Sequence, residues 1–355
     1  MQHKYFAASN SSEGFKSYFS EIFGDTDVLY VIKGGPGTGK SRFMKKCAME
    51  AEKKGAEVEY YYCSSDPASL DGVLMKHGER TVGIIDGTPP HAWEPDHPGV
   101  TEEIVNLGAF WNPAVLRGQK NEIMALSGKK STAYKRAYDY LRSCGNLRAV
   151  TDSLLRTVVD AEKLRGAAER QVRSLGLPHG RMRELPALRC AVSMSGLCVL
   201  DSFEANAKTC IRIANLYGVG RIYLGAVREA LRPFGVTARI SYDPVDPRCL
   251  DGILIEETGV AFLLADKGEV EESEKAVNTR RFVRQDALRE VRGELRYATR
   301  LYDECLDGAL HALSEAKVYH FLLEDIYKHA MDFPTLTQFT ERFAAELGDA
   351  QGLCP

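Results

Sequence analysis

Several classes of protein are excluded by what the sequence lacks. Its 355 residues contain no run of 18 apolar residues, and the first fifteen include no apolar segment of the kind that directs secretion. Its nine cysteines are scattered, odd in number and never spaced as C-x-x-C, unlike those of a disulfide framework or a structural zinc site. A net charge of −3 does not fit a surface built throughout for nucleic acid. We therefore expect a soluble, cytoplasmic protein with reduced thiols and no membrane contact.

What the sequence does contain is a phosphate-binding loop in its usual context. Residues 34–41 read GGPGTGKS and match the pattern G-x-x-x-x-G-K-[ST]. An apolar, β-branched run (27–33) precedes the loop and predicts a buried strand, and the run after it (40–55) has helical spacing. Further strands are predicted at 56–64 and 80–86. This order of strand, glycine loop, helix and strand predicts an α/β domain of the P-loop type with a parallel sheet.

The residue types of this loop suit a nucleoside triphosphate, ATP or GTP. Its glycines permit positive φ and a close approach of the backbone to phosphate oxygens, and successive N–H groups at the start of a helix attract anions. Lys40 would reach the β- and γ-phosphates, and the Ser41 hydroxyl would bind Mg²⁺. The residues expected to bind the nucleotide are Gly34, Gly35, Pro36, Gly37, Thr38, Gly39, Lys40, Ser41 and Arg42.

A P-loop also needs an acidic residue that holds Mg²⁺, normally at the end of a neighbouring strand. Asp86, which ends the run TVGIID, is predicted to do this, although an Asp at a strand end can simply cap the next turn. Many P-loop ATPases place a Glu directly after that Asp, but here Gly87 follows it. We therefore consider His91 as a residue that orients a water or binds a substrate, the alternative being an exposed loop histidine. Neighbouring candidates are Thr88, Glu94 and Asp96. The predicted catalytic residues are Lys40, Asp86 and His91, and the predicted metal ligands are Ser41 and Asp86.

The sequence repeats itself at an interval of 180 residues. Residues 55–75 align without a gap on 235–255 and share Asp-Pro and Leu-Asp-Gly at the same positions. The same register brings TVGIID opposite AFLLAD, so that Asp86 faces Asp266. We interpret this as a tandem duplication. The predicted organisation is a P-loop NTPase domain (1–112), a basic helical arm and linker (113–186), a degenerate P-loop-like domain (187–270) and an acidic helical arm with a C-terminal tail (271–355).

The second copy has lost the phosphate loop. Opposite GGPGTGKS stands ANLYGVGR (214–221), where Val-Gly-Arg replaces Gly-Lys-Ser. Arg221 could still bind an anion, but a solvated arginine at the start of a helix is the favoured interpretation. Asp66 and Asp71, in SSDPASLDG, could act as a base or metal ligand near the strand ends. Because DPRCLDG keeps both aspartates in a copy without a phosphate loop, a shared turn with local hydrogen bonds is favoured.

Each copy continues into a long stretch of helical periodicity. In the first (113–175) Gly145-Asn146 predicts a break between two antiparallel helices, and the second (271–332) ends before Pro334. The first arm, counted to residue 183, carries 15 Lys and Arg against 6 Asp and Glu, whereas the second, counted to residue 349, carries 11 against 16. The basic arm could close over the triphosphate, face the acidic arm or contact a nucleic-acid backbone, which is not favoured. Its candidate residues are Lys129, Lys130, Lys135, Arg136 and Arg142.

The strings GGPGTGKS, YYYCSSDPASLDG, IIDGTPPH and NLGAFW resemble those of an uncharacterised family of bacterial P-loop ATPases with two tandem P-loop-type halves. The resemblance covers most of the chain and implies nucleotide binding by residues 34–41. It also implies that the second half can carry a P-loop of its own, from which ANLYGVGR departs. GPGTGKS is similar to the loop of AAA-type ATPases as well, but the missing Asp-Glu pair argues against a standard motor of that kind.

Three functions fit these features. The favoured one is slow, Mg²⁺-dependent ATP hydrolysis in the first half, coupled to movement of the helical arms, with a second half of structural or regulatory role. The rival enzyme is a P-loop kinase with the basic arm as its lid and a small-molecule acceptor near His91. The non-enzymatic rival is a nucleotide-dependent interaction switch, which the absent Glu favours. A protein partner or an acceptor is not indicated by any motif.

Overall fold

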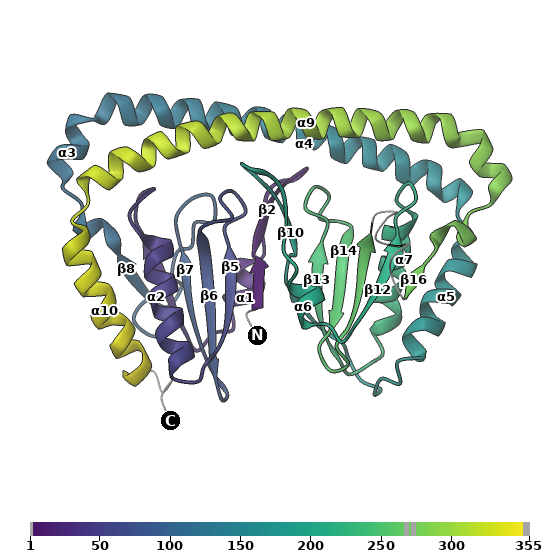
Figure 1. Cartoon of the computed structure of the whole chain (residues 1–355), viewed down its shortest axis with the longest axis horizontal. Coiled ribbons are helices and arrows are strands. Elements are labelled where there is room, and N and C mark those ends of the chain that lie inside the picture. The colour runs from purple at the N-terminus through teal and green to yellow at the C-terminus, as the bar shows by residue number, and fades with distance from the viewer. Residues whose placement is uncertain (1–2, 266–269, 271–274, 351–355) are drawn as a thin grey trace.

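Two α/β halves lie side by side beneath a pair of long helices (Figure 1). The computed structural model describes residues 3–265, 270 and 275–350. The strands of the first sheet are β1 (His3–Phe6), β4 (Val28–Lys33), β5 (Glu57–Tyr62), β6 (Leu70–His77), β7 (Arg80–Asp86) and β8 (Glu102–Asn106). Those of the second sheet are β9 (Arg183–Pro186), β12 (Thr209–Ala214), β13 (Thr237–Tyr242), β14 (Leu250–Ile255), β15 (Val260–Ala265) and β16 (Ala276–Val277). The order is β1-β5-β6-β7-β4-β8 in the first and β9-β13-β14-β15-β12-β16 in the second, which is the same order strand for strand.

The sheets are mixed, so the expectation of parallel sheets is wrong for one strand in each. β6 runs antiparallel to both of its neighbours, and β14 does the same in the second sheet. The cause is the short connection 63–69: a parallel return needs a crossover of a dozen or more residues, so a chain this short must fold back beside β5. LDG, the end of the segment SSDPASLDG that we interpreted as a turn, is therefore the start of a strand.

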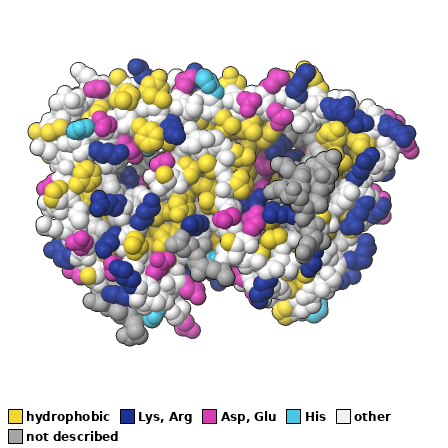
Figure 2. Space-filling view, viewed as in Figure 1, with side chains coloured by type: hydrophobic (Ala, Val, Ile, Leu, Met, Phe, Trp, Pro, Cys, Tyr) yellow, Lys and Arg dark blue, Asp and Glu magenta, His cyan; other side chains and the backbone are white. Residues whose placement is uncertain are grey.

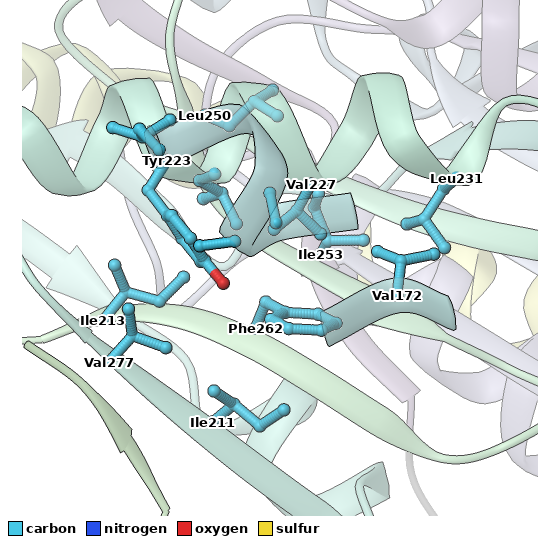
Figure 3. Close-up of a cluster of buried hydrophobic side chains, with 14 of the residues drawn as sticks. Val172, Ile211, Ile213, Tyr223, Val227, Leu231, Leu250, Ile253, Phe262 and Val277 are labelled. Carbon is cyan, nitrogen blue, oxygen red and sulfur yellow. The ribbon is translucent and has the colours of Figure 1, made fainter. Parts of the chain in front are cut away.

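Each sheet is covered on its outer face by the helix that follows its first glycine-rich segment. These helices are α2 (Lys40–Lys53) in the first half and α7 (Val219–Leu231) in the second. A further helix packs on each: α10 (Phe333–Ala350) on α2, and α5 (Ala161–Arg173) on α7. Figure 3 shows Val172 of α5 facing Leu231 and Phe262 in the core of the second half. The helix that ends the first arm thus lies over the second half, and the helix that ends the second arm lies over the first half.

Two long helices connect each half to the helix that packs on the other half. They are α4 (Lys120–Val158) and α9 (Gln285–Ala330), which run antiparallel along the top of Figure 1. The predicted break at Gly145-Asn146 is wrong, because α4 is continuous through both residues. Gly145 has a packing reason instead: a Cβ there would lie 2.6 Å from the Cβ of Ser12. α9 ends at Ala330, before Pro334 as predicted.

Short elements complete the two halves. They are the hairpins β2 (Ala8–Ser11)–β3 (Gly14–Ser17) and β10 (Cys190–Ser193)–β11 (Gly196–Val199), the helices α1 (Phe19–Phe23), α3 (Pro113–Gly118) and α6 (Ser202–Asn206), and the 3₁₀ turns η1 (Leu107–Phe110) and η2 (Thr279–Phe282). The predicted linker 176–186 is partly wrong, since its last four residues form β9 at the edge of the second sheet, paired with β13 as β1 is with β5. Asp266, the predicted counterpart of Asp86, lies outside the described residues.

The two sheets share one buried apolar cluster, to which both contribute aromatic and aliphatic side chains. Phe6 and Leu188 exchange backbone hydrogen bonds of 2.8 and 3.2 Å across the joint. Glu59 on β5 and Arg239 on β13 form a buried ion pair there, with 2.9 Å between Oε1 and Nη2. Figure 2 shows hydrophobic side chains gathered in the middle of the face that Figure 1 presents, below the long helices. The halves are therefore joined as a single packed body.

The eight described cysteines are all free. Within the ranges that the structure describes, none of the helices has both the length and the apolar character required to cross a membrane.

Candidate functional site

The glycine loop (residues 34–41) joins β4 to α2 at the carboxyl end of the strand. Gly37 and Gly39 have φ of 68° and 88°, a region that favours glycine, and α2 begins at Lys40 as the pattern predicts. The Lys40 ammonium donates to the carbonyls of Gly34 (3.1 Å) and Gly35 (2.8 Å). Its Nζ also lies 3.4 Å from Oδ2 of Asp86. Lysine, helix start and acidic strand end therefore meet at one place.

The loop is also a packing surface for α9, which sequence reasoning did not anticipate. A Cβ at Gly35 would lie 2.6 Å from the ring of Tyr327, and one at Gly37 would lie 2.7 Å from the carbonyl oxygen of Glu324. Two of the glycines thus permit the close approach of a helix that belongs to the second copy. Ser41 is held in place as well, because its Oγ accepts a hydrogen bond of 2.9 Å from the backbone N–H of Leu70.

Asp86 and His91 form one buried cluster with Asp71. His91 Nδ1 lies 2.7 Å from the carbonyl oxygen of Asp86, and its Nε2 lies 3.3 Å from Oδ2 of Asp71. The side chain of His91 is 5% exposed, so the alternative of an exposed loop histidine is wrong. The ring stacks on Phe19, with centroids 5.2 Å apart and planes 14° apart. Asp86 also accepts from the N–H and hydroxyl of Thr88, so it caps the next turn in addition to facing Lys40.

The favoured turn interpretation holds for one of the two aspartates of SSDPASLDG. Asp66 accepts hydrogen bonds from the N–H of Ala68 (3.4 Å) and the hydroxyl of Ser69 (2.8 Å), which is a local turn. For Asp71 the turn interpretation is wrong, because it lies on β6 beside His91. Burial lowers the pKa of His91, but the charges of Asp71 and Asp86 and their hydrogen bonds outweigh it and raise that pKa to about 9.

Three adjoining cavities follow the glycine loop. The base cavity, of about 200 Å³, lies between the start of α2 and α10 and includes Arg42 and Phe333. The loop cavity, of about 320 Å³, lies over the loop and includes Ser41 and Asp86. The chamber, of about 770 Å³, begins at Lys40 and Asp86 and extends under α4. Base and loop cavities share Arg42 and Phe333, and loop cavity and chamber share Lys40 and Asp86, so the three form one continuous track.

The chamber has mainly apolar walls and a polar end. Its aromatic and aliphatic lining includes Phe15, Trp111, Tyr134, Tyr138 and Met194, the last of these from the second half. Its polar end holds Lys40, Asp71, Asp86 and His91. Lys130 of α4 lines it too, and burial together with the nearby charge of Lys40 lowers the pKa of Lys130.

The other candidates of the basic arm turn toward solvent or toward the acidic arm. Arg136 pairs with Glu315 of α9, and the Lys129 ammonium lies 5.8 Å from the ring centroid of Tyr319 on α9. Arg142 pairs with Asp139 of its own helix at 2.9 Å. Lys135 is exposed. Of the five, Lys130 is the one that lines the cavities.

No protein-family model, curated protein or solved structure matches this chain. The site therefore has to be judged by the arrangement of its own residues.

In the second half, the segment that corresponds to the glycine loop (214–221) ends in a buried arginine, Arg221. Arg221 is 9% exposed, so the interpretation of a solvated arginine is wrong. Its Nη2 lies 3.5 Å from Oδ1 of Asp152 on α4, and a Cβ at Gly218 would meet that nitrogen at 2.5 Å. The Arg221 guanidinium thus packs against the turn at Gly218. The corresponding turn of the first half borders the loop cavity.

Three residues of the site had no signal in the local sequence. His320, Glu324 and Lys328 line the loop cavity from α9. The hydrogen bond from His320 and the ammonium of Lys328 outweigh burial and lower the pKa of Glu324 to about 2. Their helical spacing of four residues places them on one face, but nothing near them resembles a nucleotide motif. Only the exchange of helices brings them to the glycine loop.

Proposed function

We propose that the first half is a P-loop nucleoside triphosphatase that binds ATP, or GTP, with Mg²⁺. The observation that carries the proposal is the convergence of Lys40, Ser41 and Asp86 at the middle of a continuous track of cavities. A triphosphate in the loop cavity would direct its base toward Arg42 and Phe333 and its γ-phosphate toward the chamber. The start of α2 and the positive-φ glycines supply N–H groups and a positive dipole end for the phosphates.

The donors around the loop fit Mg²⁺, which prefers oxygen ligands. The Ser41 hydroxyl and the Asp86 carboxylate are the groups that would hold the ion, and the ion would offset the negative charge that develops on the phosphates during transfer. Lys40 is bound to two loop carbonyls and to Asp86, contacts that phosphate oxygens would replace. Asp86 keeps its orientation through Thr88. The favoured reaction is slow hydrolysis, with His91 placed to orient a water at the end of the chamber.

A small-molecule kinase is the second candidate, and the chamber favours it. Hydrolysis requires room for one water, whereas a cavity of about 770 Å³ is in the range of ligand-binding pockets. In that reaction an acceptor hydroxyl oxygen would bond to the γ-phosphorus, the bond to the β,γ-bridging oxygen would break, and nucleoside diphosphate would leave. The hydroxyl proton would pass to one of the carboxylates at the polar end.

We infer further that the two halves arose by tandem duplication and that the second is a degenerate copy. Their strand orders are the same, and their joint is symmetric: Ser12 donates its N–H to Val245 (2.8 Å), and Met194 donates its N–H to Ser65 (3.0 Å). Buried Arg221 supports a structural rather than a nucleotide-binding role for segment 214–221. We therefore expect one triphosphate per chain.

Lys40→Ala tests the proposal directly. Two charge-assisted hydrogen bonds to phosphate are worth about 1.5–3 kcal/mol each, so the loss should weaken ATP binding by about 10²–10⁴-fold. Lys53→Ala, on the same helix but with a side chain 63% exposed, is the control and should leave affinity unchanged. Wild-type affinity in Lys40→Ala, or two nucleotides per wild-type chain in calorimetry, would overturn the assignment.

Turnover separates the candidate reactions. Free phosphate from wild-type protein with Mg²⁺ and ATP supports hydrolysis, and ADP formed only when a metabolite is added supports the kinase. Tight binding with neither product supports the nucleotide-dependent switch. All three outcomes are compared with Lys40→Ala, which should show no turnover.

A further inference from the structure

We propose that Asp71, Asp86 and His91 form a binding site for a divalent transition-metal ion of the Mn²⁺ or Zn²⁺ class, distinct from the Mg²⁺ that accompanies a nucleotide. One ligand atom from each residue lies within 4.8 Å of the others, and all three residues are buried. Ligands about 2.0–2.2 Å from one ion are themselves about 3–4.4 Å apart, so small side-chain rotations complete the site. This inference does not depend on nucleotide binding, although the two sites share Asp86.

The strand register brings two carboxylates together at this point, where Lys40 and His91 are their partners. β6 pairs antiparallel with β7, and Gly72 lies opposite Ile85. Asp71 precedes Gly72 and Asp86 follows Ile85, so the two carboxylates lie at the same end of this strand pair, where neighbouring like charges are destabilising. Both are buried, with side chains 7% and 11% exposed, so water screens them little.

The histidine is oriented so that its Nε2 faces the two carboxylates' side of the cluster. Its Nδ1 is 2.7 Å from the Asp86 carbonyl oxygen, which can only accept, so Nδ1 carries a hydrogen. In the neutral ring the lone pair is then on Nε2, the nitrogen that faces Asp71 at 3.3 Å. A backbone carbonyl that fixes the tautomer in this way is the usual outer-shell partner of a metal-binding histidine. Stacking on Phe19 fixes the plane of the ring.

In the second half, an arginine side chain supplies the positive charge at the position that corresponds to Asp71. Asp251, which aligns with Asp71, contacts Arg189 Nε at 2.6 Å, and Arg189 also pairs with Glu204 at 2.7 Å. A guanidinium that is permanently charged and held by two carboxylates leaves no ligand position open. In the first half the partner of Asp71 is instead an imidazole on the wall of the chamber, which can exchange a proton for a metal ion.

The chemistry of the donors selects the class of ion. Two carboxylates and one imidazole suit Mn²⁺, Fe²⁺ or Zn²⁺ better than Ca²⁺ or Mg²⁺, which prefer oxygen alone. Three protein ligands leave positions open toward the chamber. An ion held there would lower the pKa of a nearby water or hydroxyl, chemistry that either candidate reaction needs beside a γ-phosphate.

The test uses Mn²⁺ and the full-length chain without nucleotide. Electron paramagnetic resonance of free Mn²⁺ should show one ion bound per chain, and pulsed measurements should detect coupling to an imidazole ¹⁴N in the wild-type protein. Asp71→Asn and His91→Ala should each weaken binding by about 10–100-fold. Asp66→Asn, on the adjacent turn, is the matched control and should bind as the wild type does.

Three results would overturn the metal site. They are no Mn²⁺ bound at millimolar concentration, bound Mn²⁺ without nitrogen coupling, and retention of binding in His91→Ala. Each would identify the cluster as an internal ion pair between Asp71 and a protonated His91. Lys40→Ala keeps the two proposals separate, because it should lose ATP binding while still binding Mn²⁺.

Discussion

Arg239→Met tests the joint on which the shared architecture depends. The Glu59 carboxylate accepts from Arg239 Nη1 at 3.1 Å and Nη2 at 2.9 Å, from Lys76 at 2.8 Å and from the Tyr61 hydroxyl at 2.7 Å. Glu59 and Arg239 are 7% and 8% exposed, so neither charge is solvated. Removing one partner of a buried pair costs about 3–5 kcal/mol. Because Glu59 keeps Lys76 and Tyr61, we expect the lower end, about 3 kcal/mol.

The measurement is urea denaturation followed by fluorescence and circular dichroism. The only two tryptophans, Trp93 and Trp111, both belong to the first half, so fluorescence reports that half while circular dichroism reports the whole chain. Arg173→Met is the control: its pair with Glu169 is 70% and 41% exposed, and its loss should cost less than about 0.5 kcal/mol. Equal free energies of unfolding for the two variants at pH 7 would refute the importance assigned to this ion pair.

The dependence on pH gives a second, independent check of the same pair. Burial alone would raise the pKa of Glu59, but Arg239 and Lys76 hold it well below its usual range. A carboxyl whose pKa is lower in the folded state stabilises the fold above its unfolded pKa of about 4.3, and that contribution is lost as the pH falls. The difference between wild type and Arg239→Met should therefore shrink below about pH 4. A difference that stays constant down to pH 3 would point to lost packing rather than lost charge.

Two further substitutions address the approach of the long helices. Glu324→Gln removes a negative charge from the loop cavity and should tighten ATP binding by about threefold to tenfold at 0.15 M salt, measured by calorimetry. Asp325→Asn, at an exposed position, is the control and should leave ATP affinity unchanged. Weaker ATP binding by Glu324→Gln would contradict the placement of that charge. Gly145→Ala should lower the melting temperature, because the added Cβ would lie 2.6 Å from Ser12. Gly128→Ala, in the same helix, is the control: its Cβ meets nothing within 4 Å, so this variant should raise the melting temperature. Equal shifts in the two variants would show that α4 is not held at Gly145.

Local patterns in the sequence predicted the parts of the molecule that local physics determines. The glycine loop, the start of α2 at Lys40 and the strand that ends at Asp86 all occur where residue type and periodicity placed them. β6 was missed because Asp71 and Gly72 are poor strand formers, and its place is fixed by the short connection before it.

The partners of the helices could not be predicted from periodicity. An apolar stripe shows that a helix packs against something, but α10 and α5 have no signal that assigns them to the opposite sheet. For the same reason Glu324 and Lys328 could not be predicted as site residues. They line the loop cavity from α9, which is far from the glycine loop in sequence. His91 was identified as a candidate, yet the ring that covers it belongs to Phe19, at the start of the short helix α1, which the sequence did not indicate.

The exchanged helices give the second half a reason to persist without a phosphate loop of its own. The base cavity needs α10, and the glycine loop is packed against Tyr327 on α9, so residues 1–112 alone would lack both. α9 begins beside the second sheet, where Arg284 donates its N–H to Val158 (3.0 Å), and it ends where Asn112 donates its N–H to Ala330 (2.7 Å). A ligand that displaces the loop must therefore act on a helix anchored in both halves. None of these contacts involves residues 214–221, so the second half supports the first independently of any ligand at that segment.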